Sequence, residues 1–292
     1  MRLIAALGAI LVSIGCQPPR LENVETFVTY PDGRVSEMVE TSLMEGGVPI
    51  RLQILYKKPK GDGPFPLLVL NHGSTGRGND PSKFRTPSFY DAIARYFVAR
   101  GWMVAVPQRR GRGWSDGLYD EGFNSSRSYY TCETYRSLKG ADRALTDIAA
   151  AMEVLTKRTD VDGTRVVIGG VSRGGIISVA FAGKNPNKVQ GVINFVGGWI
   201  SDRCYNADEI NGTLARMGAA FPKPMIWIYS HGDRYYSIEH SKANFRKFIE
   251  GSGKGEFIVS GFGHGFWRQP SYWENEVGKY MSKLGFSEFT RR

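Results

Sequence analysis

Apolar and polar positions alternate along the first part of the chain. The side chains at 50, 52, 54 and 56 are apolar, and Arg51 and Gln53 lie between the first three. This period of two is typical of a strand with one buried face. Turn signals at 31–33 and 46–47 divide this part into three predicted strands, at 25–30, 34–43 and 48–57.

Further along the chain, short and continuous apolar runs replace the alternating pattern. They lie at 66–70, 103–106, 166–168, 189–196, 225–229 and 256–259. Such runs are typical of strands buried on both faces of a parallel sheet. Helical patterns alternate with them at about 88–100, 137–158, 173–184, 237–250 and 271–284. The pattern predicts an α/β fold with a mostly parallel sheet, an antiparallel entry and one domain over residues 24–292.

Two stretches, at 108–136 and 197–222, show no strong period. Each follows a predicted strand, so we expect both at the carboxyl edge of the sheet, where open α/β sheets bind ligands. Loops of this length in a compact domain usually have a function or are disordered. Their many aromatic side chains favour ordered loops that cap a site.

The first residues have the pattern of an export signal. Arg2 is followed by an uncharged segment at 3–15, which is too short to span a bilayer as a helix. The segment ends at Cys16 and resembles the lipobox of bacterial lipoproteins, with Ser13 where a leucine is usual. We therefore expect a signal peptide at 1–15, a lipid on Cys16 that binds the membrane, a tether at 16–23 and a place in the periplasm or cell envelope. An ordinary secretory signal and a cytosolic protein are the alternatives.

The amino-acid composition excludes further classes of protein. The chain has 292 residues, of which 12% are aromatic and only 3 are cysteine, which excludes a disordered chain and a disulfide-stapled miniprotein. The formal net charge is +10, but the basic residues form no nucleic-acid-binding motif. Metal-ligand spacings and a Rossmann glycine run are absent from the sequence, so we expect no metal, cofactor or nucleic acid.

Residues 170–174 read Gly-Val-Ser-Arg-Gly, a G-x-S-x-G pentapeptide. It directly follows one predicted strand and precedes a predicted helix. In that context the turn is a nucleophile elbow, which lifts a serine hydroxyl above the sheet edge. The glycines leave room for a strained turn, and the helix N-terminus adds free N–H groups. Ser172 is therefore the candidate nucleophile, and an incidental serine in a glycine-rich turn is the alternative.

A serine hydroxyl needs a base that removes its proton and an acid that orients the base. Of the four histidines, only His264 follows the last predicted strand, as the chain order of elbow enzymes requires. Asp233 follows the strand at 225–229 and is the candidate acid. Asp202, in the 197–222 loop, is the alternative acid.

The oxyanion of an acyl-transfer intermediate needs N–H donors. The candidates are the backbone N–H groups of Arg173, directly after the nucleophile, and of Ser74, in the glycine-containing segment 71–76 after a predicted strand. We expect His72 to organise this segment rather than to act as a base. A glycine turn without a catalytic role is the alternative.

These motifs, together with the segments 110–117, 231–233 and 263–265, resemble those of the α/β-hydrolases, and within them the dienelactone-hydrolase and prolyl-oligopeptidase-like branches. The resemblance covers about residues 45–285. It implies an α/β-hydrolase fold and a Ser-His-Asp serine hydrolase. Dienelactone hydrolases carry a nucleophilic cysteine where this chain has Ser172. A carboxylesterase is our reading, with a small ester as substrate; a peptidase of short peptides and a non-catalytic binding protein are the alternatives.

The remaining cysteines, Cys132 and Cys204, fall one in each long loop. In an oxidising compartment they are expected to pair and to join the loops, whereas two free buried thiols are the alternative. Several arginines in and near the same loops could bind an anionic substrate, although a solvated or structural role is expected for most of them. Glu121 and Glu133 are candidate anchors for the amine of a peptide substrate.

Overall fold

The computed structural model describes residues 25–290 of the chain. The expected signal segment and Cys16 lie outside them. Within this part, no helix has the length and apolar character that crossing a membrane requires.

All strands of the described residues form one nine-stranded sheet in the order β1-β2-β3-β5-β4-β6-β7-β8-β9. The first three strands, β1 (Phe27–Thr29), β2 (Val35–Glu45) and β3 (Val48–Lys57), form an antiparallel edge, and β3 pairs antiparallel with β5. The other strands run parallel: β4 (Phe65–Asn71), β5 (Met103–Pro107), β6 (Val161–Val171), β7 (Gly191–Phe195), β8 (Met225–His231) and β9 (Gly255–Phe262). The predicted antiparallel entry and parallel sheet are confirmed.

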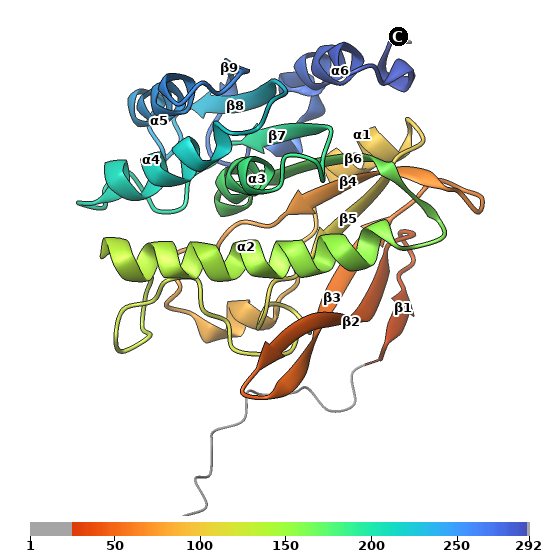
Figure 1. The fold of residues 1–292 in the computed structure, drawn as a ribbon, viewed down its shortest axis with the longest axis horizontal. Helices are drawn as coiled ribbons and strands as arrows, with labels where there is room; N and C mark the ends of the chain where they lie inside the picture. The colour runs from red at the N-terminus through yellow and green to blue at the C-terminus, as the bar shows by residue number, and fades with distance from the viewer. Residues whose placement is uncertain (1–24, 291–292) are drawn as a thin grey trace, which may run out of the picture.

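Helices cover both faces of the sheet (Figure 1). On one face, α2 (Thr134–Thr156), α3 (Arg173–Lys184), α4 (Ala207–Gly218) and α5 (Ile238–Glu250) follow one another across the sheet. On the other face, α1 (Asp91–Val98) meets the C-terminal segment that carries α6 (Glu274–Lys283), where the rings of Tyr96 and Trp273 pack edge to face. Both layers bury apolar side chains against the sheet, which explains why β4, β5 and β7 read as continuous apolar runs.

The helix α4 corrects one prediction, because it lies inside the 197–222 stretch that showed no strong period. Apart from Gly212, its buried residues follow a helical spacing: Ala207, Ile210, Asn211, Leu214, Ala215 and Gly218. The spacing is present in the sequence, but Asn211 and Gly218 occupy core positions and hide it from a count of apolar residues. The 108–136 stretch matches its prediction more closely, since it holds only an isolated bridge between Phe123 and Tyr130 before α2 begins at Thr134.

The strand register brings distant loops together at the carboxyl edge. Asn71 pairs with Gly170, so the segment after β4 emerges beside the turn after β6. His231 pairs with Phe262, so the loops after β8 and β9 also leave the sheet together. The residues that the sequence singled out as candidates therefore follow neighbouring strands.

Candidate active site

Ser172 occupies a strained backbone position between β6 and α3. Its φ of 58° and ψ of −124° lie in a region that residues other than glycine rarely adopt. The turn is possible because its neighbours lack a Cβ. A Cβ on Gly174 would overlap the backbone of Asn71, and one on Gly170 would overlap Gly174 itself. The elbow expected from the sequence is therefore present as a strained turn, with Ser172 at its apex.

His264 and Asp233 form a hydrogen-bonded pair, with 2.7 Å between His264 Nδ1 and Asp233 Oδ2. The carboxylate is buried, and its Oδ1 accepts from the backbone N–H groups of Tyr235 and Tyr236 at 2.8 and 3.3 Å. Because an ionised carboxylate only accepts, the proton of the imidazole lies on Nδ1. Nε2 is then free to accept a proton, which is the state that a general base needs.

Asp202, the alternative acid, has another partner. Its Oδ2 accepts from the backbone N–H of Ser237 at 2.7 Å, and its own N–H donates to Tyr235 O at 2.9 Å. Asp202 thus fastens the turn before α5, whereas Asp233 carries the contact with His264.

Tyr236 is a site residue that the sequence analysis missed. Its buried hydroxyl donates to Gly198 O at 2.6 Å, and the side chain of Ser172 lies near enough to influence its pKa. Burial raises the pKa of Tyr236, so the phenol stays neutral, and its single proton is already given to Gly198. Toward Ser172 it can only accept. The pair of tyrosines soon after Asp233 was the one signal in the sequence.

The side chain of Ser172 lies beside that of Tyr236. Among residues 25–290, no hydrogen bond joins Ser172 Oγ to His264 Nε2. The ring of Tyr236 lies 5.8 Å from the imidazole, centre to centre, so Tyr236 is close to both groups. Catalytic hydrogen bonds are often long before substrate binds.

The candidate oxyanion donors lie on both sides of Ser172. The N–H of Arg173 is the first of α3 and has no partner within the helix. Across from it, a Cβ on Gly73 would lie 3.3 Å from the Cβ of Ser172. The N–H groups of Gly73 and Thr75 are bound by the hydroxyls of Tyr90 and Tyr130, at 2.9 and 3.2 Å.

Ser74 lies between these two residues, and no partner of its N–H is found within the described part of the chain. His72 organises the same segment, as expected. Its Nδ1 bonds Gly73 O at 2.8 Å and its Nε2 accepts from the N–H of Arg109 at 3.1 Å. Burial, and then the charge of Arg109, hold the pKa of His72 well below its usual value, so the ring is neutral.

The arginines of the 108–136 loop are mostly internal rather than free to bind a substrate. Arg109 pairs with Glu121 at 2.5 Å, and Arg110 pairs with Asp147 at 2.6 Å, all four side chains being buried. Arg112 is also buried and donates to Thr86 O and Ser88 Oγ. The guanidinium groups of Arg109 and Arg110 therefore organise the loop, which is the structural role expected for most of these arginines, whereas Arg112 keeps two buried guanidinium nitrogens without a partner among the described residues.

The two candidate amine anchors are also occupied. Burial opposes ionisation of Glu121, but the charges of Arg109 and Arg173 outweigh it and lower the pKa of this carboxyl. Glu133 instead begins α2, where its carboxylate accepts from the N–H groups of Tyr135 and Arg136 at 2.8 and 2.9 Å. Neither carboxylate is free to bind the amine of a peptide.

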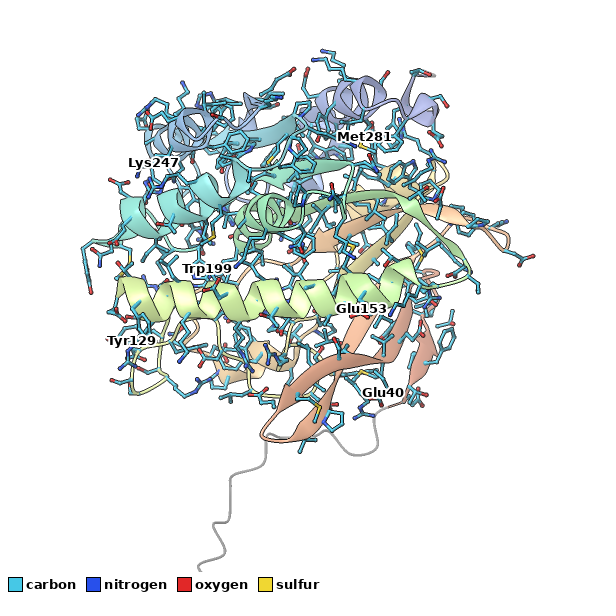
Figure 2. All side chains as sticks on the ribbon, viewed as in Figure 1. Glu40, Tyr129, Glu153, Trp199, Lys247 and Met281 are labelled. Atoms are coloured by element: carbon cyan, nitrogen blue, oxygen red, sulfur yellow. A yellow bond between two sulfur atoms is a disulfide. The ribbon has the colours of Figure 1, made fainter. Side chains whose placement is uncertain are left out.

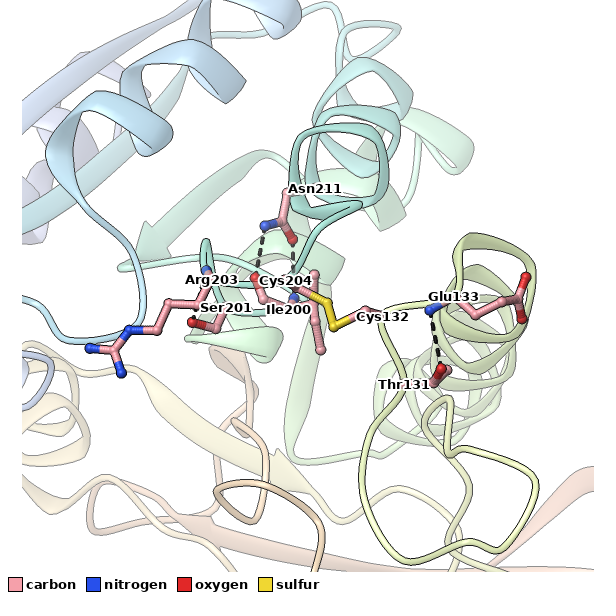
Figure 3. Close-up of a disulfide and its surroundings, with 8 residues drawn as sticks. All are labelled: Thr131, Cys132, Glu133, Ile200, Ser201, Arg203, Cys204 and Asn211. Carbon is pink, nitrogen blue, oxygen red and sulfur yellow. Dashed lines mark hydrogen bonds between the residues drawn. A yellow bond between two sulfur atoms is a disulfide. The ribbon is translucent and has the colours of Figure 1, made fainter.

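The disulfide expected between the two long loops is present, and it joins Cys132 to Cys204 (Figure 3). Just before Cys204, Asn211 of α4 holds both the N–H and the carbonyl of Ile200, at 3.2 and 2.8 Å. The side chain of Trp199, labelled in Figure 2, reaches α2 through a 3.0 Å hydrogen bond to Ser137 O. The two loops are thus fixed to each other and to the helices beneath them.

Replacing both Cys132 and Cys204 by serine is expected to lower the free energy of unfolding by about 2–4 kcal/mol, because the bond removes conformational freedom from the unfolded chain. The two residues are 72 positions apart, so the closed loop is long. Urea denaturation followed by tryptophan fluorescence measures the effect, with the reduced wild type as the control. An unchanged midpoint, or two thiols that alkylate freely in the unreduced protein, would contradict it.

Comparison with known proteins finds a matching family and several similar structures. The model of the dienelactone hydrolase family matches residues 77–225. An acetyl xylan esterase from Paenibacillus sp. R4 superposes with a TM-score of 0.59 at 16% identity, covering 89% of this chain and 86% of that one. An acylaminoacyl peptidase from Pyrococcus horikoshii gives a TM-score of 0.57 at 14% identity, covering 91% of this chain but 42% of that one.

A curated relative, an alpha/beta hydrolase domain-containing protein from Arabidopsis thaliana, is 38% identical over 69 residues. That match covers 24% of this chain and about a fifth of the length of the relative, 21%. The architecture is the α/β-hydrolase fold. The chain belongs to the dienelactone hydrolase family.

Proposed function

We propose that this protein is a serine hydrolase that cleaves carboxylic esters through an acyl-enzyme. The observation that carries the proposal is the Asp233–His264 pair, whose contact of 2.7 Å leaves a basic nitrogen at the same sheet edge as Ser172. Ser172 itself lies on a strained turn at the start of a helix. A nucleophile, an oriented base and unpaired N–H donors together are the parts that acyl transfer requires.

In the proposed reaction, His264 Nε2 takes the proton of Ser172 as Oγ attacks the ester carbonyl carbon. The N–H groups of Arg173 and Ser74 stabilise the oxyanion of the tetrahedral intermediate. The intermediate collapses, and His264 returns the proton to the departing alcohol. Water then attacks the acyl-enzyme with the same base, and the acid product leaves. Asp233 orients the imidazole and stabilises its cation but keeps its own charge.

An ester is favoured over a peptide because the chain offers no free amine anchor at the candidate positions. Glu121 is enclosed by arginines and Glu133 caps α2. The family name does not extend the proposal to dienelactones, since the nucleophile here is the serine hydroxyl. A hydroxyl depends on the base for activation more than a thiol does.

Purified protein is expected to hydrolyse p-nitrophenyl acetate and butyrate with a kcat/KM at least about 10²-fold above that for aminoacyl p-nitroanilides, a difference of roughly 2.7 kcal/mol in activation free energy. Absorbance of the released chromophore measures both. Faster cleavage of the anilides would make the protein a peptidase. Absence of turnover together with absence of fluorophosphonate labelling would leave only the binding-protein alternative.

A further inference from the structure

A buried carboxylate, Glu121, lies at the centre of a polar network beside the site. It accepts from Arg109 Nε at 2.5 Å and from the hydroxyl of Tyr119 at 3.0 Å, and Arg173 Nη1 lies 3.4 Å from its Oε2. The hydroxyl of Tyr119 is 2.6 Å from that of Tyr130. All five side chains are buried, so every group in the network needs its partners within the protein.

The proton positions of this network follow from the carboxylate at its end. Glu121 is ionised and only accepts, so Tyr119 gives it its single proton. Burial, then the charge of Glu121, raise the pKa of Tyr119 well above its usual value, which keeps that proton in place. Tyr130 must then donate to Tyr119, and its oxygen is left to accept.

The two groups that donate to Tyr130 both belong to Thr75. The Thr75 hydroxyl is 2.8 Å and the Thr75 N–H 3.2 Å from the Tyr130 oxygen. Hydrogen bonds therefore run in one direction, from Thr75 through Tyr130 and Tyr119 to Glu121. Each phenol has one proton to give and two lone pairs, and Tyr130 uses all three. Chains of this kind polarise one another and strengthen each link.

Glu121 also reaches the other end of the 71–76 segment. Arg109, which Glu121 fixes, donates through Nη1 to His72 O at 3.0 Å and through its backbone N–H to His72 Nε2 at 3.1 Å. His72 and Thr75 are thus anchored to the same carboxylate from both sides of Ser74. Arg173, whose backbone N–H is the other proposed oxyanion donor, is connected to the same residue, because its Nη1 donates to Glu121 O at 2.8 Å.

We propose that this relay aims the Ser74 N–H at the oxyanion, and that Tyr130 is its positioning residue. The inference rests on the proposed function, because it assigns Ser74 the oxyanion role. Tyr130 is suited to the task because its ring also lies against the Arg173 guanidinium, 3.7 Å from the carbon of that group to the ring centre. One side chain therefore connects the residues that carry both donors. The disulfide at Cys132 fixes the loop two residues further on.

Tyr130→Phe removes the hydroxyl but keeps the ring against Arg173. Thr75 then loses the acceptor of two donors, and the segment around Ser74 turns to find others. A misplacement near 1 Å in a catalytic group costs up to about 10²-fold in rate, so we expect kcat to fall by about 10- to 100-fold. KM should stay within about twofold, since an oxyanion donor acts in the transition state rather than on bound substrate.

Tyr129→Phe is the matched control. It removes the same hydroxyl from the adjacent residue, which is more than half exposed and whose hydroxyl has no partner among the described residues. Its kcat and KM should equal those of the wild type.

A trifluoromethyl ketone, which forms a tetrahedral adduct with the serine, should bind the Tyr130 variant more weakly by the factor lost in kcat. Thr75→Val, which removes one of the two donors, should show a smaller loss in the same direction.

A Tyr130 variant with wild-type kcat, or one whose kcat loss leaves ketone affinity unchanged, would overturn the relay. A lowered melting temperature alone does not explain a selective loss of ketone binding, so a merely structural role is distinguishable. If the wild type turns over no ester, the proposed function fails. The relay is then judged from the rate at which a fluorophosphonate inactivates Ser172, because its tetrahedral phosphorus oxygen uses the same donors; equal rates in wild type and variant would refute it.

Discussion

Replacement of Ser172 by alanine is expected to lower kcat for p-nitrophenyl acetate by about 10⁶-fold, the loss seen when a serine nucleophile is removed from a triad. The methyl group has no oxygen to attack the carbonyl, so neither His264 nor the oxyanion donors have a covalent intermediate to act on. The backbone strain at a φ of 58° remains, because alanine also carries a Cβ, so stability should change little. Initial rates and thermal melting measure the two quantities.

The control for this experiment is Ser125→Ala, purified in the same way. Ser125 is exposed on the 108–136 loop and should leave the rate unchanged, which separates loss of the nucleophile from loss of a contaminating esterase. A fluorophosphonate should label the wild type and the control but not the Ser172 variant. Activity of the Ser172 variant within tenfold of the wild type, or labelling that persists, would refute the proposed mechanism.

Much of the fold follows from local patterns in the sequence. The runs that became β4 and β7 are buried on both faces, and a strand in that environment has no polar face to mark its period. The helix α4 escaped detection for the opposite reason. Its core face includes Asn211, which is buried because it bonds the backbone of Trp199 and Ile200 rather than because it is apolar. A polar residue with a backbone partner is indistinguishable in sequence from an exposed one.

The candidate site also contains residues that the sequence predicts and residues that only the structure shows. Ser172, Asp233 and His264 are marked by their position after strands, because the chain order of the sheet fixes which loops meet. The sequence position of Glu121 gives no comparable signal. Its role depends on Arg109, twelve residues away, and on Arg173, 52 residues away. Only the folded chain shows that its charge is enclosed by guanidinium groups, so in the sequence it was as plausible an amine anchor as any loop carboxylate.

Asp233→Asn is expected to lower kcat by about 10⁴-fold through the wrong imidazole tautomer. Two backbone N–H groups, those of Tyr235 and Tyr236, donate to Oδ1 of Asp233. In the variant only the amide oxygen can accept from them, so its NH₂ group must occupy the position of Oδ2, which faces His264 Nδ1. An NH₂ group donates, so Nδ1 loses its proton and Nε2 gains it. A protonated Nε2 in a neutral ring cannot accept the proton of Ser172.

The matched control is Asp202→Asn, the same change in the other candidate acid. Its Oδ2 accepts from the N–H of Ser237, and an amide oxygen performs that task equally well. We expect kcat within about threefold of the wild type, because the retained hydrogen bond keeps the turn before α5 in place and Asp202 does not bond His264. Ester hydrolysis and the rate of fluorophosphonate inactivation should both fall with Asp233→Asn and hold with Asp202→Asn. The reverse pattern would transfer the acid to the 197–222 loop, and equal small effects would remove the carboxylate from the mechanism, because an imidazole of the correct tautomer would then need no orienting acid.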